Sequence, residues 1–360
     1  MLGDRKASPD RPAIPFRDLK IDVLLISAPP NVRYLSGFTG DNGLLLLTPD
    51  SQTLFTDPRF TIQASQECNC EVNTVTKTPL DQAALQTIRK RRWKRVGFEA
   101  SRMLYEMHRR LVESLPKGVR LKPIGPVVEK LRMIKSDAEI ARIRRSVLTN
   151  SEAFENATRS IRLGARESAI AAELEYQMRR LGAEKAAFET IVAIGSRSAL
   201  PHAQPTARKL GNDELLLIDM GACQDGYMSD MTRVLFFGQP SRRLRSMYNA
   251  VLKAQLAAID AVRPGITAAL VDRAARRVLE TEGLGKEFVH STGHGLGLEI
   301  HEGPRLGRRD KTKLEPGMAI TIEPGAYIRD FGGIRIEDTV LVTKHGCEVL
   351  TPTSKELRLL

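Results

Sequence analysis

The sequence is poor in cysteine, and this limits the kinds of site and compartment that it fits. Only four of its 360 residues are cysteine. Cys68 and Cys70 form a C-x-C pair, which lacks the C-x-x-C spacing usual in zinc and redox sites. Cys223 and Cys347 stand alone. The pattern favours small buried thiols in a reducing compartment.

Long apolar runs are absent as well. No stretch approaches the roughly eighteen apolar residues that a membrane-spanning helix needs. The N-terminus is charged and rich in proline, without the apolar core of a signal peptide. We therefore expect a cytoplasmic protein with no membrane partner.

Several familiar catalytic signatures are missing too. There is no G-x-S-x-G nucleophile elbow, and residues 293–297 (G-H-G-L-G) lack the spacing of either phosphate-binding fingerprint. Cys223 lies close to Asp219 in the sequence, but a cysteine nucleophile would need a histidine partner, which we cannot assign. These gaps argue against a serine hydrolase, a nucleotide-binding loop and a cysteine enzyme.

The composition is globular and basic. Hydrophobic residues make up 42% of the chain and the net charge is +12, in a length sufficient for two domains. Part of the charge is concentrated in residues 89–95 and 308–313. We interpret these runs as solvated faces or loops, so nucleic acid is not an expected partner.

The first part of the chain alternates short strands with helices. Residues 21–27 predict a buried strand, and residues 43–48 and 52–56 predict a hairpin. Residues 59–67 and 80–92 are typical of helices. Together they indicate an α/β unit.

A second unit begins near Ser136. This serine and Glu139 have the spacing of a capping box at the start of a helix. The helix is predicted to run to about Arg162, and a second helix to end at Gly182. A strand is expected at residues 188–194.

The same order of elements then recurs. Ser241 can cap a helix that runs to about Val262, and another helix is expected at about residues 267–282. Two helices followed by strands, twice over, predict a duplicated α/β unit.

Four carboxylates and one histidine stand in unusual sequence words. The words are L-L-L-I-D-M-G-A, Y-M-S-D-M-T-R, G-H-G-L-G-L-E-I-H-E, I-T-I-E-P-G-A-Y and G-I-R-I-E-D-T-V, and they contain Asp219, Asp230, His294, Glu323 and Glu337. Four carboxylates brought together would repel one another, and two divalent cations would cancel their charge. Oxygen-rich ligation with one imidazole suits a two-metal hydrolytic centre.

Strand periodicity brings some of these residues together. Asp219 ends an apolar run, and residues 227–237 are expected to return as a strand after a turn, which would place Asp230 beside it. Arg335 and Glu337 are two residues apart in a predicted strand, so they share one face. A carboxylate that faces inward beside an arginine requires an explanation.

Each word has an ordinary interpretation when it is taken alone. Asp219 would only end a strand, Asp230 would only pair with Arg233, and His294 would be an exposed loop histidine. The two glutamates would be turn and edge charges. Five such coincidences, four of them beside apolar strand-like runs, favour a metal centre.

The words resemble those of the pita-bread metallopeptidases, in the aminopeptidase P and prolidase (Xaa-Pro peptidase) branch. Residues 31–38 (N-V-R-Y-L-S-G-F) and 56–59 (T-D-P-R) resemble the creatinase-type N-terminal domain. Residues 131–140 (L-R-M-I-K-S-D-A-E-I) resemble the segment that opens the catalytic domain. The resemblance implies an α/β creatinase-like domain at residues 1–133 and a pita-bread catalytic domain at residues 134–360, with a duplicated α/β unit and a curved antiparallel sheet.

The resemblance also implies how the ligands divide. Asp219 would bind one metal ion, and His294 and Glu323 would bind the other. Asp230 and Glu337 would bridge the two ions. A metal-bridged hydroxide would attack the scissile carbonyl, and Glu323 would guide the proton.

Four further residues match family positions around the ligands. His202, in A-L-P-H-A-Q-P, would be a catalytic residue that acts on the leaving group or the substrate. His301 would stabilise the tetrahedral intermediate and contact substrate. His290 and Arg335 match substrate-facing positions.

The implied activity is hydrolysis of an Xaa-Pro bond, at the N-terminus of peptides or in dipeptides, so the substrates carry proline in second position. The implied cofactors are two divalent metal ions, for which oxygen-rich ligation favours manganese, with cobalt, zinc and iron as alternatives. A homodimer is implied as well. The alternatives are a methionine-type aminopeptidase and a non-catalytic relative that binds protein or nucleic acid. The word around Pro201-His202 argues against the first, and the complete ligand set against the second.

Overall fold

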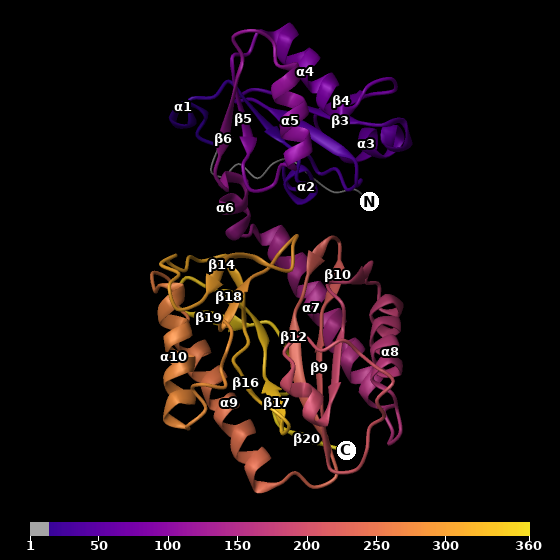
Figure 1. The fold of residues 1–360 in the computed structure, drawn as a ribbon, viewed down its shortest axis with the longest axis vertical. Coiled ribbons are helices and arrows are strands. Elements are labelled where there is room, and N and C mark those ends of the chain that lie inside the picture. The colour runs from indigo at the N-terminus through magenta and orange to yellow at the C-terminus, as the bar shows by residue number, and fades with distance from the viewer. Residues whose placement is uncertain (1–13) are drawn as a thin grey trace. The chain divides into compact units, whose positions relative to one another are not determined.

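The computed structural model describes residues 14–360, so most of the charged, proline-rich N-terminus lies outside the described residues. The chain divides into two compact units, the first ending at Arg132 and the second spanning Met133–Leu360 (Figure 1). None of the helices in residues 14–360 has the length and hydropathy to cross a membrane.

The N-terminal unit is built on one mixed sheet of six strands in the order β4-β3-β2-β1-β5-β6. Its elements are α1 (Phe16–Leu19), β1 (Val23–Ile26), α2 (Pro29–Ser36), β2 (Gly43–Leu47), β3 (Gln52–Thr56), a 3-10 turn (Pro58–Phe60), α3 (Thr61–Glu67), β4 (Glu71–Thr74), α4 (Leu80–Arg91), β5 (Arg95–Glu99), α5 (Tyr105–Ser114), β6 (Arg120–Ile124) and α6 (Val127–Met133). The predicted hairpin is present, because β2 pairs antiparallel with β3. Central β1 pairs antiparallel with β2 and parallel with β5.

Helices α4 and α5 contribute the apolar cover of this sheet. Leu25 and Phe55 on the strands cluster with Ile88 of α4 and Leu111 of α5, and all four are almost fully buried. This burial explains why the strands are apolar runs, since removing such side chains from water is the main force that stabilises the unit.

The two basic runs lie at the surface. Residues 89–92 are exposed at the C-terminal end of α4, and Arg95 pairs with Asp22 at 2.5 Å. In the second run the side chains of Arg308 and Lys311 are exposed. Their exposure agrees with the interpretation of solvated faces.

The C-terminal unit contains two helix pairs and several antiparallel sheets. Its elements are α7 (Asp137–Thr158), α8 (Glu167–Arg180), β7 (Lys185–Ala186), β8 (Ile191–Ile194), a 3-10 helix (Gly195–Ala199), β9 (Glu214–Met220), β10 (Ala222–Gln224), β11 (Tyr227–Met228), β12 (Met231–Phe237), α9 (Arg242–Ala261), α10 (Ala268–Thr281), β13 (Gly293–Gly295), β14 (Glu302–Leu306), β15 (Ala319–Ile322), β16 (Gly325–Ile328), β17 (Gly332–Arg335), β18 (Asp338–Val342), β19 (Cys347–Val349) and β20 (Arg358–Leu359). The larger sheets have the orders β20-β12-β9-β8 and β14-β13-β15-β18-β19.

Strand β9 is buried on both faces, which explains its unbroken apolar run. Leu216 and Ile218 pack into the cluster that contains residues of α7 and α8. Leu215 and Leu217, which point the other way, pack into the cluster that contains residues of α9 and α10. The strand that carries Asp219 is therefore held between the two helix pairs (Figure 1).

The first helix pair differs from the prediction at one end. Glu139 reaches back to the backbone N–H of Ser136 at 2.9 Å, as the capping box predicts. The expected end of α7 near Arg162 is wrong, because the helix stops at Thr158. There Ile161 turns into the core, and the Arg162 guanidinium donates to the carbonyls of residues 159 and 161. These bonds satisfy carbonyl groups near the helix end.

The second helix pair follows the predicted pattern. The Ser241 hydroxyl accepts a hydrogen bond from the N–H of Leu244 at 3.2 Å and caps α9. Helix α10 occupies Ala268–Thr281. Each helix pair is followed by antiparallel strands, so the duplicated order of elements is confirmed.

Candidate metal centre

Asp219 and Asp230 lie on neighbouring segments, but the returning strand is broken. The single strand expected at residues 227–237 is wrong, since β11 and β12 are separated at Ser229-Asp230. The reason is local. The Ser229 hydroxyl accepts a hydrogen bond from the N–H of Ala222 at 2.9 Å, and the backbone N–H of Ser229 donates to the Ala222 carbonyl at 2.9 Å. Asp230 is thereby left just outside β12, whose Thr232 is the register partner of Asp219.

His294 is held in strand β13 by two glycines. A Cβ atom at Gly293 would lie 2.0 Å from the Thr321 carbonyl oxygen, and one at Gly295 would lie 2.0 Å from that of Gly303. Only glycine permits this approach of the neighbouring backbones. The interpretation of His294 as an exposed loop residue is wrong, because its side chain is 12% exposed and lies in a sheet.

The imidazole of His294 is prepared to act as a ligand. Burial lowers its pKa to about 4, so the ring is neutral near pH 7. Its Nδ1 lies 3.0 Å from the Gly295 carbonyl oxygen, which can only accept a hydrogen bond. The proton therefore sits on Nδ1, and Nε2 presents its lone pair to the carboxylates.

The two glutamates stand at strand ends. Glu323 follows β15, and its N–H donates to the Thr292 carbonyl at 2.7 Å. Glu337 lies between β17 and β18, and its N–H donates to the Thr232 carbonyl at 3.2 Å. The Thr232 hydroxyl donates to the Glu337 carboxylate at 2.7 Å, so both the backbone and the side chain of Glu337 are tied to β12.

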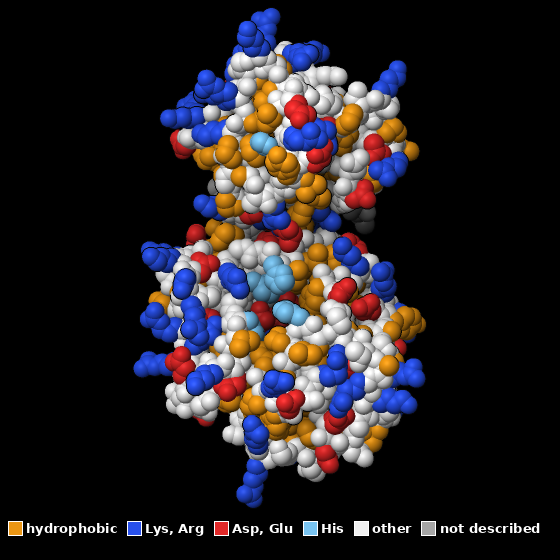
Figure 2. All heavy atoms as spheres, in the orientation of Figure 1, with side chains coloured by type: hydrophobic (Ala, Val, Ile, Leu, Met, Phe, Trp, Pro, Cys, Tyr) orange, Lys and Arg blue, Asp and Glu red, His pale blue; other side chains and the backbone are white. Residues whose placement is uncertain are grey.

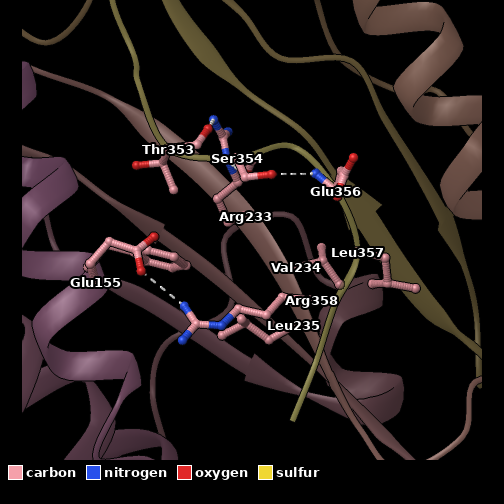
Figure 3. Close-up of a pocket in the computed structure, with 10 residues that line it drawn as sticks. Glu155, Arg233, Val234, Leu235, Thr353, Ser354, Glu356, Leu357 and Arg358 are labelled. Atoms are coloured by element: carbon pink, nitrogen blue, oxygen red, sulfur yellow. Dashed lines mark hydrogen bonds and ion pairs between the residues drawn. The ribbon is translucent and has the colours of Figure 1, made fainter.

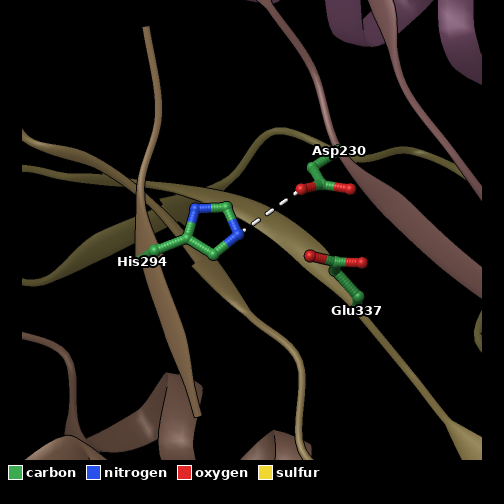
Figure 4. A group of neighbouring side chains, drawn as sticks. All are labelled: Asp230, His294 and Glu337. Atoms are coloured by element: carbon green, nitrogen blue, oxygen red, sulfur yellow. Dashed lines mark ion pairs between the residues drawn. The ribbon is translucent and has the colours of Figure 1, made fainter. Parts of the chain in front are cut away.

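Three of the five predicted ligands converge at one point. Asp230, His294 and Glu337 each offer one ligand atom, and these atoms lie within 4.8 Å of one another (Figure 4). The fourth, Glu323, places Oε1 at 3.5 Å from His294 Nε2. The fifth, Asp219, turns one oxygen to the Nη2 of Arg335 at 2.5 Å.

The electrostatics of this group are unfavourable without cations. Burial, followed by the negative charges of nearby carboxylates, raises the pKa of Asp230 and of Glu337 well above the usual range. Burial also raises the pKa of Glu323 to about 7. Burial disfavours the charged form of Arg335, but Tyr327 and the surrounding carboxylates hold its pKa above the ordinary value. One arginine cannot balance four buried acids.

These donors fit a pair of divalent cations. The Oδ1 atom of Asp219 is buried and has no hydrogen-bond partner among residues 14–360. Such an atom is costly to bury unless something binds it. Two divalent ions would supply that partner and would balance the four carboxylates, while the neutral imidazole suits the same hard-to-borderline metals.

The remaining predicted residues surround this cluster. Histidine side chains gather around acidic ones in a hollow on one face of the C-terminal unit (Figure 2). The ring centroids of His301 and His294 are 4.4 Å apart. His290 places Nε2 at 2.9 Å from the Tyr327 hydroxyl, and its pKa is lowered to about 4 by burial. His202 is exposed and follows Pro201, whose carbonyl accepts from Arg335 at 3.3 Å.

Two residues of the site were not predicted. The Tyr327 hydroxyl accepts from Arg335 Nη1 at 2.7 Å and so links Arg335 to His290. Thr232 accepts from Arg335 Nε at 3.0 Å and donates to Glu337. Both lie in the sequence motifs that contain the predicted ligands. That position is the one signal by which the sequence could have identified them as site residues. Neither carries a group that typically ligates a metal, so their roles depend on tertiary geometry.

Comparison with known proteins gives a family match for each of the two units. Residues 141–344 match the metallopeptidase family M24, and residues 16–134 match the creatinase/prolidase N-terminal domain. The Xaa-Pro dipeptidase of Pyrococcus horikoshii is 40% identical over 341 residues, which cover 94% of each protein.

Solved structures share the overall fold of this chain. The Xaa-Pro dipeptidase from Bacillus anthracis superposes with a TM-score of 0.93 at 38% identity, covering 96% of this chain and 97% of that one. The X-Pro aminopeptidase from Thermotoga maritima gives a TM-score of 0.89 at 36% identity, covering 96% and 99%. The predicted fold, a creatinase-type domain followed by a pita-bread domain, is confirmed. With its family match covering more than half of its length and its ligand words intact, the chain belongs to the metallopeptidase family M24.

Proposed function

We propose that this chain is a two-metal peptidase that hydrolyses the Xaa-Pro bond of substrates with proline in second position. The observation that carries the proposal is the convergence of Asp230, His294 and Glu337 in a buried cluster of uncompensated acids. The relatives named as Xaa-Pro dipeptidases and as an X-Pro aminopeptidase support the choice of bond.

The proposed ligand set keeps the division implied by the sequence. Asp219 would hold one ion, His294 and Glu323 the other, and Asp230 and Glu337 would bridge them. Divalent cations at such a site lower the pKa of a bound water and polarise a carbonyl group. Manganese is our first choice of metal because the donors are mainly oxygen, with cobalt, zinc and iron as alternatives.

The residues of this chain supply the rest of the chemistry. Glu323, whose Oε1 lies 3.5 Å from His294 Nε2, would take a proton from the attacking water and return it to the leaving group. His301 and His202 would face the substrate carbonyl and the leaving group. Arg335 holds Asp219, Thr232 and Tyr327 together, so that Asp219 presents its second oxygen to the metal side.

A tertiary amide bond suits such a centre. An Xaa-Pro bond has no N–H on the proline side, so a peptidase that grips the extended backbone loses a contact there. A centre that acts on the carbonyl oxygen loses less. Dipeptides are the first substrate class to test, because the Pyrococcus horikoshii and Bacillus anthracis relatives are named dipeptidases. Longer peptides are the second, because the Thermotoga maritima structure is named an aminopeptidase.

One assay tests the activity and separates these two classes. Metal-free protein is supplemented with manganese, cobalt or zinc and is given Ala-Pro, Ala-Pro-Ala and Ala-Ala-Ala. We expect cleavage after the first alanine of the proline substrates only. Cleavage of neither with any of the three metals contradicts the proposal. Equal cleavage of Ala-Ala-Ala would indicate a general aminopeptidase instead.

Two further properties implied by the sequence stay predictions. The homodimer is checked by the mass of the full chain in light scattering after gel filtration. The cytoplasmic location is checked by fractionation of the source cells.

A further inference from the structure

Arg233 is buried beside the proposed metal ligands and uses every donor that it has. It lies on β12, three residues after Asp230, and is 2% exposed. Its guanidinium donates five hydrogen bonds, to the carbonyls of Thr232 (2.9 Å), Glu337 (2.6 Å), Thr353 (2.7 Å) and Ser354 (2.9 Å) and to Asp338 Oδ1 (2.7 Å). An arginine has five N–H groups, so none is left over.

Asp338 completes the arrangement. It follows Glu337 directly and is fully buried. One carboxylate oxygen accepts from Arg233, and the other accepts from Gln255 Nε2 at 2.7 Å and lies 2.8 Å from Lys355 Nζ. Both oxygens of Asp338 are thus satisfied, whereas Asp219 keeps one free of hydrogen bonds from residues 14–360. Asp338 therefore has a structural role, and the residue before it, Glu337, is the proposed metal ligand.

The C-terminal segment, residues 351–358, takes part in the same network. Figure 3 shows Arg233 beside Thr353 and Ser354, and these residues line a cavity of about 200 Å³ together with Glu155 and Arg358. The segment supplies two carbonyls to Arg233 and the ammonium group of Lys355 to Asp338. The segment is therefore connected to the proposed metal site through its contacts with Arg233 and Asp338.

The network fixes the backbone on which Glu337 stands. The Glu337 carbonyl is held by Arg233, its N–H by the Thr232 carbonyl, and the residue after it by a buried ion pair. On the other side, the Asp230 carbonyl accepts from the Thr339 hydroxyl at 3.0 Å. These hydrogen bonds tie the segments that contain Asp230 and Glu337 to each other.

We propose that Arg233, Asp338 and Lys355 are positioning residues, which use the C-terminal segment to hold Glu337 at the separation from Asp230 that a metal ion requires. The inference rests on the ligand set of the proposed function. Partners that orient a ligand typically change metal affinity by about 10- to 100-fold when they are altered.

The experiment uses the full chain, stripped of metal, in the variants Arg233→Lys and Lys355→Met. Lysine keeps the charge at position 233 but cannot make five directed hydrogen bonds. The control is Lys253→Met, which removes an exposed lysine of α9 paired with Glu282 at 2.8 Å. Each protein is titrated with Mn²⁺ in a calorimeter, its Co²⁺ absorption spectrum is recorded, and the melting temperature of the metal-free form is measured.

We expect Arg233→Lys to bind Mn²⁺ about 10- to 100-fold more weakly, with an altered Co²⁺ spectrum. Lys355→Met should shift both readouts in the same direction by less, because this lysine is partly exposed. The control should match the wild type. Failure of the wild type to bind metal refutes the proposed function itself. If the wild type binds and folded Arg233→Lys binds with the same affinity and spectrum, the positioning role is wrong. If Arg233→Lys does not fold, unchanged affinity in Lys355→Met refutes the positioning role in its place.

Discussion

The two units bury carboxylates in different ways. In the N-terminal unit, Glu99 accepts hydrogen bonds from the N–H groups of Ser27 at 2.7 Å and Ala28 at 2.9 Å, and from Asn31 Nδ2 at 2.6 Å. These donors stand at the beginning of α2, where the helix dipole also favours a negative charge. The protein itself satisfies this acid.

In the acidic cluster of the C-terminal unit, Thr232 donates to Glu337 and Arg335 donates to Asp219, but Oδ1 of Asp219 has no hydrogen-bond partner within residues 14–360. Burial, together with nearby carboxylates, raises the pKa of Asp230 and of Glu337. The comparison teaches that burial of a carboxylate does not identify a metal site. What identifies it is burial without enough donors, because the missing positive charge must then come from outside the chain.

The largest expected effect that would break the comparison is that of Asp230→Asn. This change removes a bridging charge, so kcat/KM on Ala-Pro should fall by about a hundredfold or more. The metal-free variant should be at least as stable as the metal-free wild type, because one buried negative charge is gone. Steady-state kinetics and thermal melts check both. The exposed variant Glu348→Gln is the control, and retained activity in Asp230→Asn would show that the ligand assignment is wrong.

Metal removal should have the next largest effect. A cation present at about a hundred times its Kd stabilises the folded state by about 2.7 kcal/mol for each site that it fills, and one filled site corresponds to about 5 to 10 °C for a unit of this size. Dialysis against a chelator should lower the melting temperature by that amount for each site that it empties, and added manganese should restore it. The shift should be absent in Asp230→Asn. An equal shift in that variant would place the stabilising ions elsewhere.

A smaller effect, on the pH dependence of folding stability, is expected from Glu99. Burial raises the pKa of Glu99 despite its donors, with the desolvation outweighing the hydrogen bonds. The folded state then holds the proton more tightly than the unfolded chain, so this residue's contribution to stability is present below its unfolded pKa and declines as pH rises through the folded value. Urea unfolding of Glu99→Gln and wild type between about pH 4 and pH 8 should show the wild type losing stability relative to the variant. A gain with rising pH would contradict the assigned direction.

The smallest effect is expected at an exposed acid. Glu348 meets Arg144 through two contacts of 2.5 and 2.6 Å, and both side chains are more than a third exposed. Solvent screens such a pair, so Glu348→Gln should change the free energy of unfolding by less than about 1 kcal/mol. Denaturant titration measures it. A loss of several kcal/mol in the free energy of unfolding would contradict the idea that exposed carboxylates contribute much less to stability than buried ones.

Sequence reasoning predicted the elements better than their contacts. Apolar runs and caps placed α9, α10 and the β2–β3 hairpin well, because local patterns determine them. The break at Ser229-Asp230 was missed, since the residues around it continue a β-like pattern and only the bonds of Ser229 to Ala222 interrupt it. The early end of α7 depends similarly on where Ile161 finds the core.

The site shows the same division. The motifs that contain the proposed ligands are recognisable in the sequence, and the structure brings their acidic residues together. That Asp219 is bound by Arg335 was not foreseen, although both residues were named, because the contact joins strands more than a hundred residues apart. Tyr327 and Thr232 both accept hydrogen bonds from Arg335, and Thr232 also donates to Glu337, so their roles depend on side chains that only the fold brings together.

The five proposed ligands come from separate strands or strand ends between Asp219 and Glu337. The complete set of ligands exists only after strands from both helix–strand repeats of the unit have assembled. Metal binding in this protein should consequently be a late event during synthesis, after both helix pairs have left the ribosome. Metal binding by the complete site would therefore require the complete C-terminal unit, and it would not stabilise a shorter fragment of the chain.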